Sequence, residues 1–283
     1  MTILFQDDFS DTQLVNGKLT GWPEGLIQRP DTIGFEIING NRMLKISADG
    51  DMSSGRSTEI IQYRNENETW GQLKIFFPAE FLFTAYNKWF SFCNPMFEYV
   101  DGSNTFMFEF MVCENELRLW VKREKTVAGE TTRDDYPTNF YFTREVWHTV
   151  KYHLIRHATN GIFKVWVNNE LVFEWGPGET KVHQDNFNWT PMKHYCDPDE
   201  TTNIVYWGDV ILATSEADLE GQFGPLIEPP PPEPFTMEVK PCIVTAAGAP
   251  LALLAGLRAF RTYLPGWFVR GYYSFSKFVL AGW

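Results

Sequence analysis

Alternating hydrophobic positions between residues 147 and 175 predict a β-meander of three antiparallel strands. Apolar side chains recur at every second position, which is the period of a half-buried strand. These positions are Val150, Tyr152 and Leu154, then Phe163, Val165 and Val167, then Leu171, Phe173 and Trp175. Asn160-Gly161 and Asn168-Asn169 separate the segments and tolerate the positive φ angles of tight turns. A second sheet must cover the apolar side of such a meander, so the pattern predicts a β-sandwich.

The same period recurs before and after the meander. It predicts strands at 2–9, 57–63, 73–77, 88–93, 105–112, 117–122 and 204–213, and a hairpin at 35–47 around Asn39-Gly40. Between these segments, residues 10–33, 124–138 and 176–203 lack the pattern and predict long loops. Loops of that length in a compact domain are typical of functional sites or of disorder.

The meander also carries a family resemblance. Trp147-His148 precedes a strand, and Gly161-x-x-x-Val165-Trp166-Val167-Asn168-Asn169 follows it. This arrangement resembles polysaccharide-lyase-like jelly rolls, the concanavalin-A-like sandwiches that include alginate, glucuronan and heparin lyases. The resemblance extends more weakly over roughly residues 1–215 and implies an all-β, two-sheet antiparallel sandwich. The same fold carries lyases, hydrolases, lectins and structural modules, so it does not define the function.

The composition changes beyond the last predicted strand. Residues 225–240 are a proline-rich linker, in which 229–232 and Pro234 predict a polyproline II rod. Residues 241–283 are apolar and aromatic with helical spacing, and they predict a short α-helical module. Their sequence resembles the C-terminal segment called the CFI-box, although Ile243 stands where the name-giving Phe is expected. We therefore predict a jelly-roll domain over 1–224, a linker over 225–240 and a helical module over 241–283.

The charge of the chain is unevenly distributed. The net charge is −12, but residues 235–283 hold five basic residues against Glu238 alone, so this tail is +4 and the remainder is −16. An acidic body disfavours nucleic acid as a partner. It also disfavours a strongly anionic polysaccharide, unless a local basic groove outweighs the negative electrostatic potential of the body. The aromatic content of 16% favours a broad core, with sugar-stacking surface rings as the alternative.

The cysteines and the N-terminal residues indicate where in the cell the protein is made and whether it is exported. Cys93, Cys113, Cys196 and Cys242 show no metal-ligand spacing, and we expect free thiols, with a Cys93–Cys113 pair as the alternative. The first residues have no basic region and no apolar region of a signal peptide. We therefore expect the protein to reach the surface of a virion, a filament or a cell by lysis or by another secretion route.

A lyase that acts by β-elimination needs a group that neutralises the uronate carboxylate, a base and an acid. The resembled lyases supply these from Arg-x-Glu-Leu-Arg, Gln-x-His and Tyr-Phe-Lys-x-Gly-x-Tyr strands. Here the first corresponds to 57–61, where Glu59 fits but Arg56 falls on the opposite strand face. The second retains only the amide of Asn94. The third matches Lys193 and Tyr195 only with a shifted register.

All three segments depart from the family pattern, so we expect a sandwich that is not catalytic. If the protein is a lyase, the resemblance assigns catalysis to Asn94, Lys193 and Tyr195. The candidates for glycan binding are Arg56, Glu59, Asn94, Trp189, Lys193, His194 and Tyr195, with packing of a loop as an equal alternative for Trp189. Paired glutamates at glycosidase spacing are absent from the sequence, which argues against a glucanase-type hydrolase.

Asp8, Gly40 and Asp209 resemble a structural calcium site of such sandwiches, in which hard oxygen ligands from three segments meet. The alternative is that Asp8 ends a strand and Asp209 faces solvent. If calcium is bound, we expect it to be structural.

These observations favour a glycan-binding or surface-structural domain that an assembly displays through its tail. The alternatives are an active lyase that cleaves uronate-containing glycans and a purely architectural virion or filament subunit. The expected partners are a polysaccharide or surface glycan, and other protein subunits through residues 241–283. A membrane interface is a further candidate for this tail, which is too short in its apolar run to span a bilayer.

Overall fold

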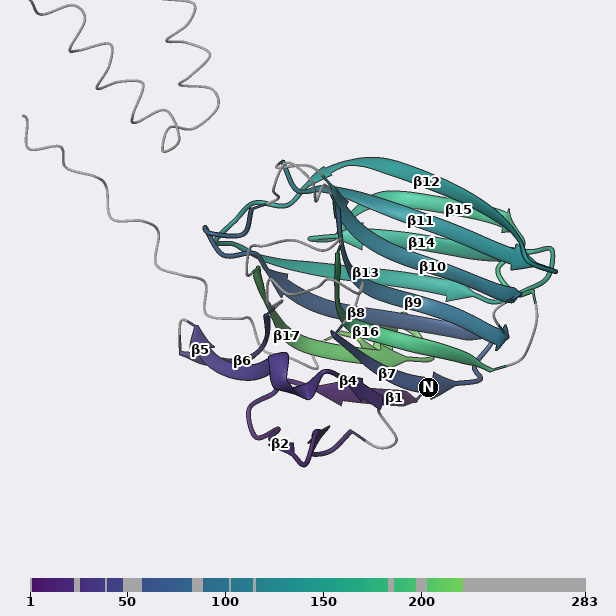
Figure 1. The fold of residues 1–283 in the computed structure, drawn as a ribbon. Coiled ribbons are helices and arrows are strands. Elements are labelled where there is room, and N and C mark those ends of the chain that lie inside the picture. The colour runs from purple at the N-terminus through teal and green to yellow at the C-terminus, as the bar shows by residue number, and fades with distance from the viewer. Residues whose placement is uncertain are drawn as a thin grey trace, which may run out of the picture. The chain divides into compact units, whose positions relative to one another are not determined.

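The computed structural model describes residues 2–22, 26–38, 40–47, 58–82, 89–101, 103–113, 116–182, 186–196 and 203–220. Their secondary structure is almost entirely β-strand, in two stacked antiparallel sheets (Figure 1). The prediction of an all-β sandwich is therefore confirmed. The chain divides into a first unit, Met1–Pro231, and a second, Pro232–Trp283. The predicted linker, the helical module and the CFI-box-like segment lie outside the described residues.

Sheet A has eight strands in the order β15-β14-β13-β8-β17-β6-β5, with β1 beside β17. Its strands are β1 (Ile3–Asp7), β5 (Ile33–Ile38), β6 (Asn41–Ser47), β8 (Glu68–Phe76), β13 (Trp147–Ile155), β14 (Gly161–Val167), β15 (Glu170–Gly178) and β17 (Ile204–Ala213).

Sheet B has seven strands in the order β12-β11-β10-β9-β16-β7-β4. Its strands are β4 (Leu26–Gln28), β7 (Thr58–Arg64), β9 (Trp89–Asp101), β10 (Asn104–Cys113), β11 (Arg118–Val127), β12 (Glu130–Tyr141) and β16 (Phe187–Cys196). The remaining described elements are a small hairpin of β2 (Leu14–Val15) and β3 (Lys18–Leu19), and the short 3₁₀ helices η1 (Pro30–Thr32) and η2 (Glu216–Asp218).

The core between the sheets is rich in phenylalanine. Alternate residues of each strand point inward, so Phe108 of sheet B and Phe163 of sheet A meet with ring centroids 4.4 Å apart. Gly71 of β8 leaves room for the Tyr152 ring of β13, because an added Cβ would lie 2.1 Å from that ring. Each phenylalanine that is fully buried here contributes about 1.5–3 kcal/mol relative to an exposed one.

The meander is found as β13, β14 and β15, in sequential antiparallel pairing. Asn168 and Asn169 adopt φ angles of 51° and 67°, which confirms the predicted tight turn. The other connection is longer than predicted. It spans residues 156–160, so Asn160-Gly161 is not a two-residue hairpin turn.

All three segments that lack apolar alternation contain strands, which corrects the predicted loops. Within 10–33 these are the short strands β2, β3 and β4. Within 124–138, β11 continues to Val127 and β12 begins at Glu130, and the exposed edge position of β12 explains its polar sequence. Within 176–203, β16 lies in the centre of sheet B. Pro191 is accommodated there at an irregularity of the register between Trp189 and Met192.

Cys93, Cys113 and Cys196 form no disulfide in the described part of the chain, so the alternative of a Cys93–Cys113 pair is not observed. Cys242 lies outside the described part of the chain. Within that part, no helix is long and apolar enough to cross a membrane.

Candidate glycan-binding face

A row of charged side chains crosses the outer face of sheet B, perpendicular to its strands. Side chains of a strand point alternately to its two faces. In sheet B, one set of alternate residues fills the core, and the other set, which includes the charged residues, points outward. We call these charged residues the charged row; from one side of the sheet to the other it consists of Glu59, Lys193, Glu109, Lys122, Glu124, Asp135 and Arg133. Acidic and basic groups alternate along most of it, and its ion pairs join β7 to β16, β16 to β10 and β10 to β11.

Lys193 of β16 is the centre of the first half of the row. Its Nζ lies 2.8 Å from Glu109 Oε1 and 3.6 Å from Glu59 Oε1. It also donates a hydrogen bond of 3.2 Å to Oδ1 of Asn94. Lys193 therefore joins β7, β9 and β10 through a single ammonium group.

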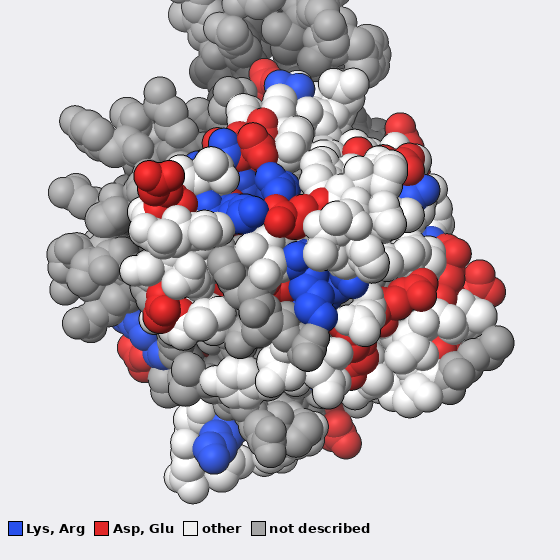
Figure 2. Space-filling model, turned by 90° about the vertical axis from the view of Figure 1, so that its right-hand side faces the viewer, with Lys and Arg blue, Asp and Glu red and all other residues white. Residues whose placement is uncertain are grey.

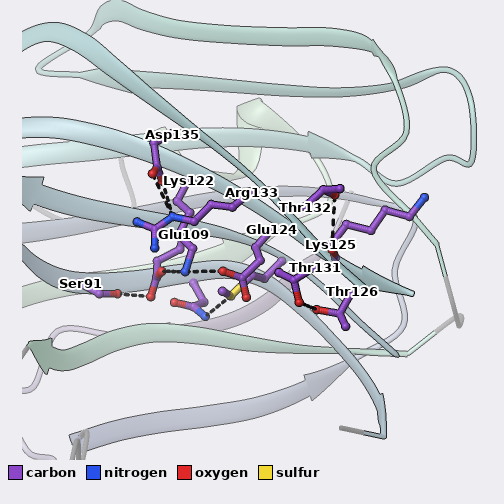
Figure 3. A network of polar contacts seen from close by, with 12 residues as sticks. Ser91, Glu109, Lys122, Glu124, Lys125, Thr126, Thr131, Thr132, Arg133 and Asp135 are labelled. Atoms are coloured by element: carbon purple, nitrogen blue, oxygen red, sulfur yellow. Dashed lines mark hydrogen bonds and ion pairs between the residues drawn. The ribbon is translucent and has the colours of Figure 1, made fainter. Parts of the chain in front are cut away.

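Glu109 of β10 connects this half to the second half. Its Oε1 accepts a 2.6 Å hydrogen bond from the Ser91 hydroxyl, and its Oε2 lies 3.2 Å from Lys122 Nζ. Lys122 in turn lies 2.9 Å from Glu124 Oε2. Figure 3 shows Glu109 between Ser91 and Lys122, with Glu124 on the far side of Lys122 and the Arg133–Asp135 pair nearby.

The electrostatics keep Glu109 and Lys193 ionised at neutral pH. Burial alone would raise the pKa of Glu109, but the ammonium groups of Lys193 and Lys122 lower that pKa to about 2. Burial likewise opposes the charge of Lys193, yet Glu109 and Glu59 raise its pKa above the usual value. Each group therefore depends on its neighbours for its charge.

Aromatic side chains flank the charged row on both sides along the strands. On one side, the rings of Trp89 and Tyr195 lie 5.1 Å apart, and Tyr195 lies 5.0 Å from Lys193 Nζ. On the other side, Phe97 and Tyr99 lie 6.0 Å apart, and Tyr99 is 52% exposed. Polar groups bordered by aromatic rings are a typical arrangement for contacts with the hydroxyls and apolar faces of a sugar.

The structure brings together four of the residues predicted for glycan binding. Glu59, Asn94, Lys193 and Tyr195 all lie at or beside the charged row. Arg56 lies outside the described residues. Sequence reasoning missed Glu109, Ser91 and Lys122, although a glutamate within the apolar strand 105–112 was an available signal.

Trp189 and His194 lie in the core instead of on the outer face. Trp189 is 1% exposed, and its ring packs 5.7 Å from that of Phe5 in sheet A. The His194 ring lies 4.7 Å from that of Phe90, and burial lowers its pKa to about 4. We therefore leave both out of the candidate site; neither packs in a loop, since β16 is a central strand.

In the predicted calcium site, the Asp209 carboxylate already has a cationic partner. Asp209 is buried and ion-paired with Lys74, whose ammonium supplies the positive charge that calcium would otherwise provide. Burial raises the pKa of Asp209, with a further contribution from the charge of Asp8, while Lys74 lowers it. Gly40 lies in an exposed turn.

No group of three or more His, Cys, Asp or Glu among the described residues is arranged to hold a metal. Asp209 is already paired with a cationic side chain, and calcium at Asp8, Gly40 and Asp209 remains a prediction. A melting temperature lowered by a chelator would support it, since a ligand bound only to the folded state stabilises that state.

Known structures share this sandwich. An endo-β-1,4-glucuronan lyase from the fungus Trichoderma reesei superposes with a TM-score of 0.60 at 15% identity, over 77% of this chain and 98% of that chain. The PL-14 alginate lyase from Aplysia kurodai superposes with a TM-score of 0.56 at 10% identity, over 76% and 100% of the respective chains. The protein has a polysaccharide-lyase-like fold.

At these identities the likeness of the polysaccharide-lyase-like sandwich shows the fold alone. No protein-family model and no curated protein matches the sequence. The function must therefore be argued from the outer face of sheet B.

Proposed function

We propose that the protein binds a polysaccharide across the outer face of sheet B, along the charged row. The observation that carries this proposal is the convergence of Asn94, Lys193 and Tyr195 beside one another at the row. Asn94 comes from β9, and Lys193 and Tyr195 come from β16, about 100 residues later in the sequence. All three are residues that the family resemblance selects. The fold shared with two polysaccharide lyases supports the same class of ligand.

The row and its aromatic borders provide two kinds of sugar contact. Carboxylates, ammonium groups and the amide of Asn94 can hydrogen-bond hydroxyl groups, and charge-assisted hydrogen bonds of this kind are the stronger ones. The rings of Trp89, Tyr195 and Tyr99 can pack on the apolar faces of sugar rings. A chain that crosses the strands would meet both kinds of contact at successive units.

We propose binding without β-elimination. Lys193 is a fully paired ammonium group, and its raised pKa removes it as a base at neutral pH. Asn94 is an amide and neither takes up nor releases a proton. The alternative of an active lyase is supported by the proximity of Tyr195 to Lys193, since a tyrosine can serve as acid or base.

We also propose that residues 241–283 attach the sandwich to an assembly. The support is their sequence: an apolar, aromatic segment of opposite charge to the body, following a proline-rich linker. Large apolar surfaces of this kind mark interaction sites.

Binding is tested with the full chain by affinity electrophoresis in a panel of polysaccharides. We expect retardation by at least one of them, and a loss of affinity of about tenfold in Trp89→Ala, because a ring that stacks on a sugar contributes on the order of 1.4 kcal/mol. Trp166→Ala, on the outer face of sheet A, is the matched control and should bind as the natural protein does. Equal affinity of all three proteins would refute the assignment to sheet B.

Catalysis is tested on the same polysaccharides by the absorbance of unsaturated uronates. We expect no increase. A strong increase that is lost in Tyr195→Phe would establish the alternative of an active lyase.

A further inference from the structure

The positive charges of the candidate face are already compensated by acidic side chains. Lys193 lies between Glu109 and Glu59, and Lys122 lies between Glu109 and Glu124. The charged row as a whole contains four carboxylates, one guanidinium and two ammonium groups, so its net charge is −1.

A uronate unit would have to displace these carboxylates. Its carboxylate would approach an ammonium group that Glu109 already contacts at 2.8 Å, and it would lie close to the Glu109 charge itself. Glu109 stays ionised because its pKa is about 2. Like charges at such distances repel, and the repulsion is stronger where water is largely excluded.

Basic side chains near the row are also engaged. Arg118 of β11 donates from Nε to the Thr138 carbonyl oxygen at 2.6 Å and lies beside the rings of Trp120 and Tyr141. At the end of the sandwich, Lys125 lies 2.8 Å from Glu179. Figure 2 shows this end, on the right in Figure 1, with Lys and Arg atoms in small groups beside Asp and Glu atoms.

The first 234 residues carry a net charge of −16, which also repels a uronate polymer and does so over a longer distance. A neutral polysaccharide meets none of these costs, because its hydroxyl groups can both donate to the carboxylates of the row and accept from its ammonium groups. The alternation of acids and bases matches a ligand with many hydroxyls and no net charge.

We propose that the outer face of sheet B selects neutral polysaccharides and discriminates against uronate polymers. This inference rests on the proposed function and goes beyond it by naming the charge class of the glycan. It separates this protein from its structural neighbours, whose printed substrates are glucuronan and alginate.

The test compares affinities of the full chain for a neutral β-glucan, a glucomannan, polyglucuronate and alginate, at about 20 and 500 mM NaCl. We expect at least one neutral polymer to bind at least about tenfold more tightly than either uronate at low salt. Affinity for the neutral polymer should be nearly independent of salt, since screening acts on charged ligands.

Glu59→Gln provides the decisive variant, because Glu59 is the partly exposed carboxylate next to Lys193. Removing its charge should raise the ratio of uronate to neutral affinity by about threefold, as expected for one partly screened charge. Glu174→Gln makes the same change on the Lys164–Glu174 pair of sheet A and should leave the ratio unchanged. Equal melting temperatures of the variants would verify that both are folded.

Two results would overturn the inference in different ways. Tighter binding of a uronate than of every neutral polymer, at low salt, would refute the charge selectivity and retain the proposed function. Failure of every polymer to bind would refute both.

Discussion

Glu109 of β10 is a buried carboxylate whose charge depends on two lysines of other strands, Lys122 of β11 and Lys193 of β16. Its pKa is about 2 in the folded protein against 4.5 ordinarily, so the unfolded chain takes up its proton first as the pH falls. The stability that Glu109 contributes is complete above pH 4.5 and is lost as the pH falls from 4.5 to about 2. The difference in pKa corresponds to about 3 kcal/mol.

We predict that Glu109→Gln lowers the free energy of unfolding at pH 7 by about 3–5 kcal/mol, because Lys193 and Lys122 lose their shared partner. The gap to the natural protein should narrow between pH 4.5 and 2, as measured by urea denaturation. Glu174→Gln, on an exposed ion pair, should cost less than about 1 kcal/mol. A gap independent of pH would contradict the assigned pKa.

His194 gives a second pH dependence in a different range. Burial lowers its pKa from 6.5 to about 4, so protonation favours the unfolded chain. Its contribution is complete above pH 6.5 and is lost as the pH falls towards 4. We predict that the difference in stability between the natural protein and His194→Gln shrinks by about 3 kcal/mol between pH 6.5 and 4. Denaturation curves across this pH range measure the difference in stability. A difference that does not change with pH would show that the His194 ring is in contact with water.

At the scale of elements, the sequence predicted strands whose residues are apolar or alternate between apolar and polar, and it missed strands with neither pattern. β17 (Ile204–Ala213) was predicted with its observed bounds, because its residues are almost all apolar. β12 was missed because an edge strand exposes most of its side chains, so that Arg133, Asp134 and Asp135 read as a loop. β16 was missed because Pro191 argues against a central strand, and the sequence does not reveal the register irregularity that accommodates this proline.

For the candidate site too, the sequence predicted what a local pattern contains and missed what depends on the tertiary structure. Lys193 and Tyr195 could be selected from the sequence because a family pattern places them there. Trp189 was expected either to bind glycan or to pack in a loop, and it is instead buried in the core beside a register irregularity of β16 that the sequence does not reveal. Ion pairs such as Lys193–Glu109 join residues 84 positions apart and depend on strand order, which no local pattern contains.

The two sheets are joined by a fully buried ion pair. Arg156, at the end of β13, lies 2.8 Å from Glu98 of β9, and neither side chain is exposed. Arg156 also lies 4.4 Å from the Phe187 ring, and the second Glu98 oxygen accepts a 3.0 Å hydrogen bond from Val182 N. The pair therefore connects sheet A, sheet B and the segment that follows β15.

We predict that Arg156→Met lowers the free energy of unfolding by about 3–5 kcal/mol, because it leaves the buried Glu98 side chain without its guanidinium partner. Lys164→Met, on the exposed pair with Glu174, should cost less than about 1 kcal/mol. Replacing both residues, as Arg156→Met with Glu98→Leu, should recover part of the loss. Guanidinium denaturation measures all three, and equal effects of the two single substitutions would show that burial of the pair is energetically unimportant.

At the scale of the whole molecule, the described core of the sandwich is built from residues that precede the proline-rich segment. β17 ends at Ala213, and the buried side chain of Leu219 packs near it against Ile211. We predict that a chain truncated after Glu228 is a folded, soluble monomer with unchanged glycan affinity, whereas the full chain oligomerises, sediments with a particle or partitions to membrane. Sedimentation velocity distinguishes them. A monomeric full chain, or a truncated chain that does not fold, would contradict this division.

The polar edge strand of sheet B affects how closely several copies of the protein can approach one another without aggregating. An edge strand offers unpaired backbone N–H and C=O groups, to which the edge of another molecule can add. On β12, charges of both signs stand close together at this edge, where Arg133 contacts Asp135 and Arg123 contacts Asp134. A neighbouring edge would have to strip water from these groups before hydrogen-bonding to the backbone. Many copies can therefore be held at high local concentration without this edge growing into a continuous intermolecular sheet.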